Sequence, residues 1–334
     1  MPTSTATTTV PETAHERFTA VHDCWVCGGA RAAPWFNDRY DLACFAEADP
    51  ELAAYTGRVV RIRRCRDCGF GQPEELPTLP NYFDRKYDLR PPTDWLAREF
   101  EATYKDLIIR TVLDGLARRL PANRRTVLDI GCHVGRFLHT ARAAGWTGEG
   151  VEVNPQTAAF AARRTGMRIH RINVARLADE GRRFDAVTLT DVLEHIPDPV
   201  RVLTQIRRLV APDGWIAVKV PCGPSQLLKQ RFRRLIRPGQ PLLVATNLGH
   251  VNQFDPRSLR IALERSGFVD VRVRPAAPEL FELPSRPKRF ASHITRQAVY
   301  TAAQWLPGGV YSPLALNLQA FGRSPAATGG TANR

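Results

Sequence analysis

The sequence predicts an α/β protein, with a mostly parallel sheet covered by helices on both faces and a small cysteine-rich module in front of it. A strand, a glycine loop, a helix and a second strand follow one another over residues 126–153. Short apolar segments then alternate with helical ones as far as residue 323. This alternation is typical of parallel sheets with helices on both faces.

The length and composition of the chain are consistent with this prediction. A chain of 334 residues with 43% hydrophobic residues suits two modest domains, or one large domain with appendages. Residues 1–20 are rich in Thr and Ala and predict a disordered tail rather than a signal peptide. Residues 324–334 predict a second tail. No segment has the ~18 consecutive apolar residues of a membrane-spanning helix, so we expect a cytoplasmic protein.

The formal charge of +14 comes almost entirely from arginine. It reflects either the base composition of the genome or an attraction to anions such as nucleic acid, a nucleotide-sugar or an anionic membrane. The densest basic block, Lys229–Arg237, has apolar residues between its charges. That pattern suits a helix lying on an anionic surface, or equally one solvated helix face. Peripheral contact with a membrane therefore stays open.

Two Cys-x-x-Cys-Gly pairs, Cys24 with Cys27 and Cys65 with Cys68, predict a zinc ribbon over residues 21–75. Two residues between the cysteines let both thiolates reach one ion, and the following glycine permits a tight turn. Four sulfur ligands complete a tetrahedral Zn²⁺ shell with no open position, so this metal should be structural. The alternative, a redox Cys-x-x-Cys, usually occurs once and opens a helix. The other cysteines are expected to be small buried hydrophobic residues: Cys44, Cys132 and Cys222.

Residues 76–125 predict a connector followed by one helix. Asp94 is a good N-cap, and apolar residues at helical spacing continue to about Leu120. From residue 126 the sheet begins. We expect strands over 126–130, 148–153, 167–171, 184–190, 214–220, 268–274 and 314–321. We expect helices over 136–145, 198–210 and 256–266.

The first strand and its loop indicate the cofactor. Asp129 lies at the end of the strand, and the loop from Gly131 to Gly135 has the form Gly-x-x-x-Gly. A loop built around a pyrophosphate usually has the form Gly-x-Gly-x-x-Gly. These details favour S-adenosylmethionine over NAD.

Three segments carry a family resemblance. Val127–Leu138 resembles motif I of class I S-adenosylmethionine-dependent methyltransferases, of the type 11/23 kind. Phe184–Pro199 resembles their fourth-strand motif, and Leu209–Trp215 resembles the stretch before their fifth strand. The resemblance implies a Rossmann-like, seven-stranded sheet with the last strand antiparallel, and a methyltransferase domain over 126–323. The cysteine pairs followed by Tyr82–Tyr87 resemble the front of bacterial methyltransferases that modify sugars and other small metabolites.

The resemblance also implies a cofactor site. In it, Glu152 would accept hydrogen bonds from both ribose hydroxyls, Asp129 would organise the loop, and Asn173 would lie beside the adenine. Asp191 would close the floor near the sulfonium. His133 departs from the family, which usually has glycine there. The implied residues are Asp129, Gly131, Cys132, His133, Gly135, Phe137, Glu152, Val153, Asn173, Val174, Thr190 and Asp191.

For catalysis, the enzyme mainly has to place a nucleophile in line with the activated methyl group. His195 is a candidate general base for a hydroxyl acceptor. Asp191, Glu194 and His195, together with His250, also resemble a metal-binding set in some RNA-end and quinone-pathway O-methyltransferases. A divalent ion there would lower the pKa of the hydroxyl. The third interpretation is that these residues only form the wall of the site.

The leading hypothesis is methylation of a small molecule, most readily at oxygen of a sugar, nucleotide-sugar or secondary metabolite. Segments 222–250 and 276–313 interrupt the alternation and are expected to cover the acceptor, and their arginines suit an acceptor bearing phosphate.

Two alternatives stay open. One is a zinc-ribbon RNA methyltransferase, although Thr190–Leu193 lacks the Asn/Asp-Pro-Pro-aromatic tetrad of base N-methylation. The other is a zinc-ribbon adaptor with an inactive methyltransferase fold, for which His133 is the only support. The sequence does not determine the oligomeric state.

Overall fold

The computed structural model describes residues 17–85, 93–172, 174–237, 244–280 and 287–326. Several predictions fall outside these ranges: Asn173, most of both predicted tails, and parts of the two predicted cover segments (238–243 and 281–286). The predicted division of the chain at residues 21–75, 76–125 and 126–323 stays a prediction.

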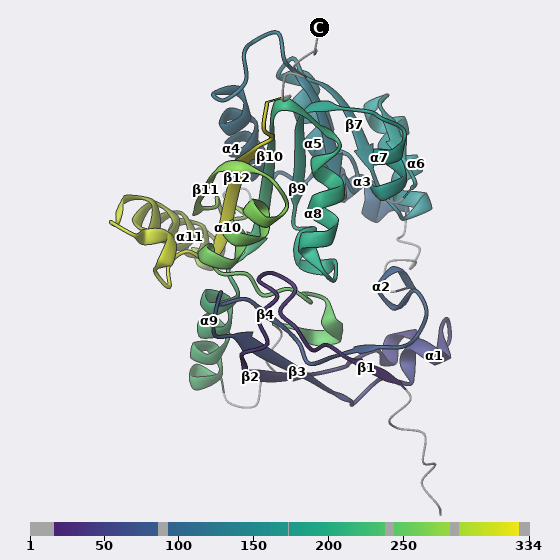
Figure 1. Ribbon diagram of the computed structural model, residues 1–334, viewed down its shortest axis with the longest axis vertical. Helices are drawn as coiled ribbons and strands as arrows, with labels where there is room; N and C mark the ends of the chain where they lie inside the picture. The colour runs from purple at the N-terminus through teal and green to yellow at the C-terminus, as the bar shows by residue number, and fades with distance from the viewer. Residues whose placement is uncertain (1–16, 86–92, 173, 238–243, 281–286, 327–334) are drawn as a thin grey trace, which may run out of the picture.

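A seven-stranded sheet forms the larger part of the molecule, in the order β11-β12-β10-β9-β6-β7-β8 (Figure 1). Only β12 runs antiparallel to its neighbours β10 and β11, while the other neighbouring pairs are parallel. The predicted mostly parallel sheet with an antiparallel last strand is confirmed. The strands are β6 (Thr126–Ile130), β7 (Thr147–Val151), β8 (Arg168–His170), β9 (Phe184–Thr190), β10 (Val210–Pro221), β11 (Val269–Pro275) and β12 (Asn317–Arg323).

Helices pack on both faces of this sheet, because alternate residues of each strand point to opposite sides. Val127 of β6 and Ala186 of β9 belong to one apolar cluster, with α4 and α5. Their neighbours Leu128 and Val187 belong to another, with α7, α8 and α10. The helices are α4 (Asp106–Ala117), α5 (Arg136–Ala143), α6 (Pro155–Thr165), α7 (Val174–Asp179), α8 (Pro199–Arg207) and α10 (Pro256–Arg265).

The single helix predicted from Asp94 to about Leu120 is wrong, because two helices occupy the segment: α3 (Thr93–Glu101) and α4. Tertiary contacts stabilise the break between them. The guanidinium of Arg136 donates to the carbonyl of Phe100 at 2.8 Å. The carbonyl of Tyr104 accepts from the backbone N–H of Leu280 at 2.8 Å. Asp94 lies in the first turn of α3 and pairs with Arg98 at 3.0 Å.

The front module contains a three-stranded antiparallel sheet of β2 (Ala32–Arg39), β3 (Val59–Cys65) and β4 (Gly71–Pro73). A second, two-stranded sheet pairs β1 (Phe18–Ala20) with β5 (Glu75–Pro77). The remaining elements of the module are η1 (Ala43–Phe45), α1 (Pro50–Ala53) and α2 (Tyr82–Arg85). The expectation that Cys44 is buried is wrong, since it is exposed at η1, whereas Cys132 and Cys222 are buried.

The module packs directly against the segment that leads into α10. Gly71 and Gln253 exchange two backbone hydrogen bonds, of 2.9 and 2.8 Å. Next to them the rings of Phe70 and Phe254 lie 5.1 Å apart between centroids. Asp255, the N-cap of α10, accepts from the guanidinium of Arg64 at 3.0 Å. The module and the large sheet therefore share one apolar core, which includes Phe70 and Phe254.

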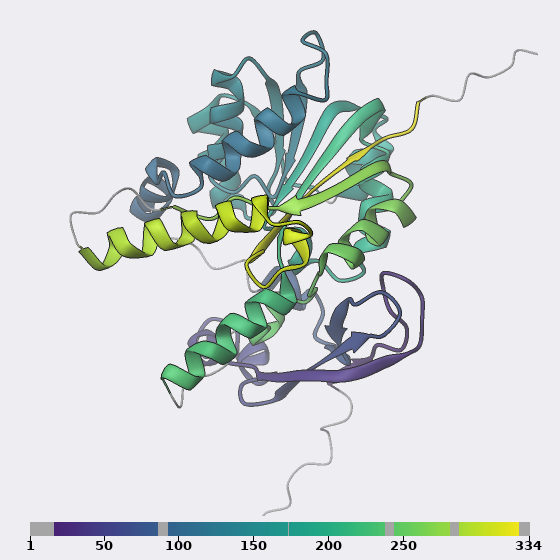
Figure 2. The same cartoon turned by 90° about the vertical axis from the view of Figure 1, so that its left-hand side faces the viewer.

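The two segments predicted to cover the acceptor contain α9 (Gly223–Ile236) with η3 (Thr246–Leu248), and α11 (Pro287–Trp305) with η4 (Gly309–Tyr311). In Figure 2, α9 and α11 project from the same side of the molecule. Leu227, Val244 and Leu248 pack into the aromatic core of the front module. Among the described residues, no helix is long and apolar enough to cross a membrane.

Candidate active site

A cavity of about 870 Å³ lies beyond the carboxyl ends of four neighbouring strands, where open α/β sheets bind ligands. Gly131 follows β6, Glu152 follows β7, Val174 lies after β8 and Asp191 follows β9, and all four line the cavity. Other predicted cofactor residues that line it are His133, Val153 and Thr190.

The loop after β6 has a left-handed backbone at three positions, Gly131, His133 and Gly135. Gly131 has φ +70°, and a Cβ atom there would lie 2.4 Å from Cγ2 of Val192, so only glycine fits. His133, where the family usually has glycine, also lies in the left-handed region with φ +51°. Its ring meets Trp95 of α3 edge-on, with centroids 5.5 Å apart. His133 therefore keeps the glycine-like backbone, and its side chain becomes part of the cavity wall.

Glu152 fixes this loop with both oxygens of its carboxylate. Oε2 accepts from the backbone N–H of His133 at 3.0 Å, and Oε1 accepts from that of Asn154 at 2.8 Å. Burial raises the pKa of Glu152, and these backbone donors oppose the rise. A carboxylate can accept about four hydrogen bonds, so each oxygen keeps capacity for a ligand in the cavity.

Other predicted cofactor residues lie behind the cavity wall. Asp129 is buried beneath the loop, where it accepts from Thr188 Oγ1 at 2.7 Å, and burial raises its pKa to about 7. Cys132 and Phe137 belong to the apolar core on the α5 side of the sheet. Gly135 is the N-cap of α5, with φ +84°. These residues shape the loop without lining the cavity. Asn173 lies outside the described residues.

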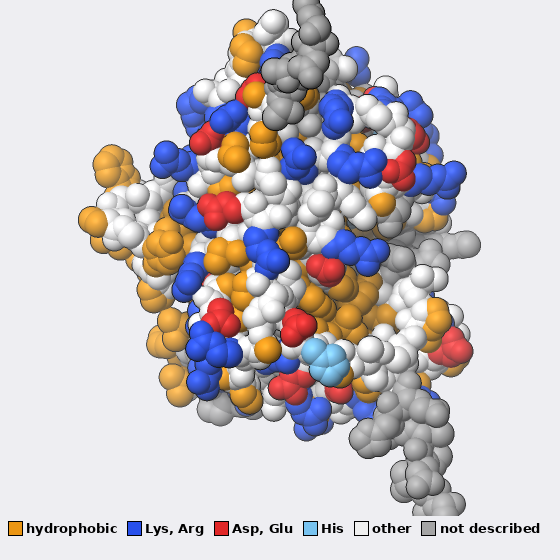
Figure 3. Space-filling view, in the orientation of Figure 1, with side chains coloured by type: hydrophobic (Ala, Val, Ile, Leu, Met, Phe, Trp, Pro, Cys, Tyr) orange, Lys and Arg blue, Asp and Glu red, His pale blue; other side chains and the backbone are white. Residues whose placement is uncertain are grey.

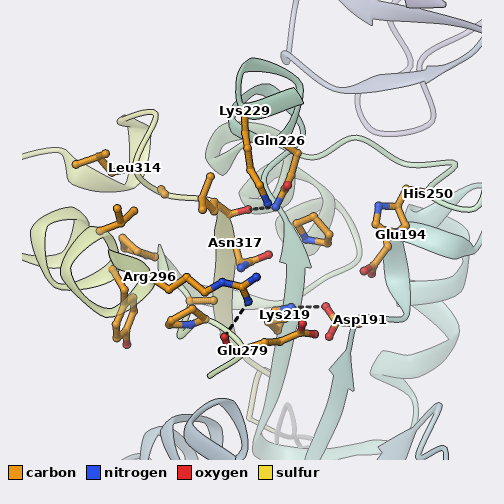
Figure 4. A pocket seen from close by; sticks show the side chains of 18 of the residues that line it. Asp191, Glu194, Lys219, Gln226, Lys229, His250, Glu279, Arg296, Leu314 and Asn317 are labelled. Carbon is orange, nitrogen blue, oxygen red and sulfur yellow. Dashed lines mark hydrogen bonds and ion pairs between the residues drawn. The ribbon is translucent and has the colours of Figure 1, made fainter. Parts of the chain in front are cut away.

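A second cavity, of about 370 Å³, adjoins the first and shares Lys105, Asp191 and His195 with it. Figure 4 shows the ion pair between Lys219 and Asp191 at the cavity. It also shows Gln226 and Lys229, which point in from α9, and Arg296, which points in from α11. Both predicted cover segments thus contribute to its lining. The charged residues around it are Lys105, Asp191, Glu194, Lys219, Lys229, Glu279 and Arg296.

Asp191 forms the boundary between the cavities. It accepts from the ammonium group of Lys219, and Lys105 Nζ lies 3.7 Å from its other oxygen. Burial opposes ionisation of Asp191, but the two ammonium groups prevail and lower its pKa. Lys219 is only 4% exposed, so the ammonium side of this ion pair is buried, whereas the Asp191 side chain is 21% exposed. Asp191 is therefore engaged by two lysines and does not belong to the group of potential metal ligands formed by Glu194, His195 and His250.

Three of the four predicted catalytic residues do come together. Potential ligand atoms of Glu194, His195 and His250 lie within 4.8 Å of one another. Glu194 is 1% exposed, and neither carboxylate oxygen accepts a hydrogen bond. His195 Nε2 lies 3.9 Å from Oε1 of Glu194. Burial, reinforced by the charge of Asp191, raises the pKa of Glu194 to about 8.

Backbone contacts hold this group in place. His195 Nδ1 contacts the carbonyl oxygen of Gly249, and because a carbonyl only accepts, Nδ1 carries the proton. The side chain of Asn252 donates to the carbonyls of Leu193 and Ile196, at 2.8 and 2.7 Å. The backbone N–H of Asn252 donates to the carbonyl of Glu194 at 3.0 Å. The segment carrying His250 is thereby tied to the turn after β9.

The family model described as "Methyltransferase domain" matches residues 100–273 of the chain, which include the strands that form the first cavity. The chain belongs to this methyltransferase family. Relatives include ubiquinone biosynthesis O-methyltransferases. The one from Paracidovorax citrulli is 35% identical over 111 residues, which cover 31% of this chain and 45% of the relative. The one from Albidiferax ferrireducens is 30% identical over 151 residues, which cover 43% and 56%. The chain spans about half the length of these curated relatives.

Two solved structures can be set beside this member of the family. An S-adenosylmethionine-dependent methyltransferase from Archaeoglobus fulgidus is 19% identical, with 70% of this chain and 100% of that one covered and a TM-score of 0.44. The sugar N-methyltransferase KedS8 from Streptoalloteichus is 25% identical, with 39% and 53% covered and a TM-score of 0.33.

The four cysteines of the methyltransferase's front module form a compact group. Their sulfur atoms all lie within 4.8 Å of one another, and two pairs are 3.5 Å apart: Cys24 with Cys68, and Cys27 with Cys65. Tetrahedral zinc with Zn–S bonds of about 2.3 Å places its sulfurs about 3.8 Å apart, so the group fits zinc. Gly28 and Gly69 have φ +75° and +83° and close the two loops.

Sequence reasoning missed several residues of the site. A signal existed for Lys219, since a lysine inside the apolar strand Trp215–Val220 must be paired when it is buried. Trp95 and Lys105 precede the recognisable motifs and have no local signature. Asn252 stands beside the predicted His250, but its role in tying two distant segments emerges only from the fold.

Proposed function

We propose that the chain transfers a methyl group from S-adenosylmethionine to a hydroxyl oxygen of a small molecule. The observation that carries this proposal is the pair of adjoining cavities, which meet at Asp191 and His195. The first contains the family's glycine loop and its acidic residue, and the second is lined with charged groups. Methyl transfer needs this arrangement, because donor and acceptor must lie in line.

The residues of the first cavity fit S-adenosylmethionine. Glu152, buried and already held by two backbone donors, would accept hydrogen bonds from the ribose hydroxyls. Gly131 lines this cavity, where its backbone would approach the methionine moiety, and Asp191 would form the floor near the sulfonium. We keep Asn173 as the proposed neighbour of the adenine. When bound, the cofactor supplies a methyl group that is already activated.

For proton removal we propose His195 as the general base. Since Nδ1 carries the proton, the lone pair of the neutral ring is on Nε2, and His195 lines both cavities. A base at the boundary between donor and acceptor can take the hydroxyl proton as the methyl group arrives.

A specific observation favours a second role for the same residues. The two unpartnered oxygens of buried Glu194, with His195 and His250 beside them, offer a ligand set for a divalent cation. A bound cation there would lower the pKa of a nearby acceptor hydroxyl. Nε2 of His195 cannot bind a cation and remove a proton at the same time. Turnover that depends on added Mg²⁺ or Mn²⁺ would support the cation role, and turnover that does not would support the base.

We propose that the acceptor carries an anionic group. Lys229 and Arg296 line the second cavity and suit a phosphate or carboxylate, as in a nucleotide-sugar, a sugar acid or an acidic secondary metabolite. The relatives named ubiquinone biosynthesis O-methyltransferases support transfer to oxygen. We further propose that the four grouped cysteines bind structural zinc.

The deciding experiment is calorimetric binding of S-adenosylmethionine to the zinc-loaded protein, beside the Glu152→Ala variant. The wild type should bind, and the variant should lose at least about tenfold in affinity, because charge-assisted hydrogen bonds to the ribose disappear. Glu180→Ala, at an exposed glutamate, serves as the matched control and should bind normally. No binding by the folded wild type would overturn the enzyme proposal and favour the adaptor. Steeply salt-dependent RNA binding would favour the RNA methyltransferase.

A further inference from the structure

The helix α9 is anchored at one end only. Its first turn is buried at Gly223, Ser225 and Leu227, and the side chain of Gln226 donates to the carbonyl of Leu316 at 2.9 Å. From residue 228 to the end of the helix, every residue except Gln230 is exposed. The second half of the helix therefore projects from the body of the protein, as Figure 2 shows.

The projecting half carries an outward-facing apolar stripe. Leu228, Phe232 and Leu235 are spaced i, i+4 and i+7, which places them on one face, and they are 51, 61 and 79% exposed. Ile236 beside them is 64% exposed. The apolar stripe of a surface helix normally faces the core. In the part of the chain that the structure describes, these side chains are exposed to solvent and do not pack against a core.

The same side of the molecule is basic as well as apolar. Residues 223–237 include five basic residues and no acidic one: Lys229, Arg231, Arg233, Arg234 and Arg237. Neighbouring α11 also has no acidic residue, and it presents Ile294 and Trp305, which are 50 and 84% exposed. In Figure 3, hydrophobic side chains gather along the left-hand edge over α11 and α9. We call the exposed residues of α9 and α11 the α9/α11 surface.

We propose that the α9/α11 surface docks on an anionic phospholipid bilayer. Helices with basic residues interleaved among Phe and Leu lie in the interface of such bilayers, and exposed Trp305 is the residue type most enriched there. The positive charge of α9 disfavours the simplest competing occupant of this surface, a second copy of the chain. In a two-fold contact with a second copy, the basic residues of one α9 would meet the same basic residues of the other, with no acidic residue on either helix to offset them.

Docking through this surface would bring the second cavity next to the lipid headgroups. Gln226 and Lys229 of α9 and Arg296 and Tyr300 of α11 line that cavity, so the helices that would touch the bilayer also form its wall. The identity of the cavity as an acceptor site rests on the proposed function, whereas docking on the bilayer does not.

The test is co-sedimentation of the zinc-loaded full chain with vesicles. Vesicles of phosphatidylcholine containing phosphatidylglycerol should bind the protein, vesicles of phosphatidylcholine alone should bind it much more weakly, and added salt should release it. Arg233→Glu with Arg234→Glu should weaken binding about thirtyfold or more. Phe232→Ser with Leu235→Ser should weaken it about tenfold or more, because apolar area no longer enters the interface.

The matched control is Arg163→Glu with Arg168→Glu, which changes two exposed arginines, one on α6 and one on β8. The strand β8 is the edge strand farthest from β11 in the large sheet. An equal loss in this control would assign the binding to net charge and overturn the proposal, as would the absence of vesicle binding by the wild type. Light scattering tests the other occupant, a second copy of the chain. If the wild type forms a dimer but does not bind vesicles, and Phe232→Ser with Leu235→Ser abolishes that dimer, the surface is a contact between two copies. Calorimetric binding of S-adenosylmethionine by each variant reports separately on the fold and on the proposed function.

Discussion

Replacing Glu194 by Gln perturbs a buried carboxyl group in the wall of the second cavity. The carboxyl group is fully buried, accepts no hydrogen bond, and has a pKa raised to about 8 from an ordinary value of 4.5. The folded state therefore favours the protonated form. Stability contributed by that form is intact below pH 4.5 and is lost as the pH rises through about 8.

The magnitude follows from these two pKa values. At about 1.36 kcal/mol per pKa unit, the wild type should lose on the order of 4 kcal/mol of unfolding free energy between pH 5 and pH 8.5 through this group alone. The glutamine of Glu194→Gln cannot ionise, so the unfolding free energy of the variant should not fall with pH through this position. Any cost of burying the amide is the same at every pH. The stability of the variant relative to wild type should therefore rise with pH, whatever its starting value.

Urea denaturation followed by circular dichroism, in steps across this pH range with zinc retained, measures the difference. Glu180→Gln, at an exposed glutamate, should follow the wild type at every pH. Under the second proposed role, in which Glu194 helps to hold a divalent cation, Mg²⁺ or Mn²⁺ at pH 8 should raise the denaturation midpoint of the wild type but not that of Glu194→Gln. Parallel stability curves for wild type and Glu194→Gln would refute the reasoning, because they would mean that Glu194 is ionised and paired.

Three further changes test other parts of the site. His195→Gln should lower turnover about a hundredfold or more with unchanged cofactor affinity, as measured by mass spectrometry of methylated product and by calorimetry. Gly131→Ala should weaken cofactor binding about tenfold or more, since its Cβ would lie 2.4 Å from Val192 Cγ2; adding Val192→Ala should restore only part, because φ +70° remains unfavourable. Cys68→Ser should abolish stoichiometric zinc, measured by atomic absorption, and lower the melting temperature, because the metal links two distant loops.

The strands of the large sheet could be predicted because each is encoded locally. The predicted strand at 184–190 coincides with β9, since a run of apolar and β-branched residues ends at the acidic motif. The cysteine group was equally accessible, because the spacing within each pair restricts the geometry whatever lies between the pairs. These signals depend only on neighbours in the sequence.

The rest depends on contacts between distant residues. Asp191 lines both cavities, but its pairing with Lys219 of the adjacent strand arises only when β9 and β10 align. The break between α3 and α4 follows from Arg136 and Leu280, both remote in sequence. Helical periodicity continues through this break, so no local pattern revealed it.

The contact between Gly71 and Gln253 has a consequence for the folding unit of this protein. The family match at residues 100–273 excludes β12, which lies between β10 and β11, and the whole front module. A fragment cut to that match would lose the strand that joins the edge strand β11 to β10. It would also expose Phe254, which is fully buried against Phe70. The front module is therefore no detachable accessory, and the smallest autonomous piece of this chain is longer at both ends than its recognisable domain.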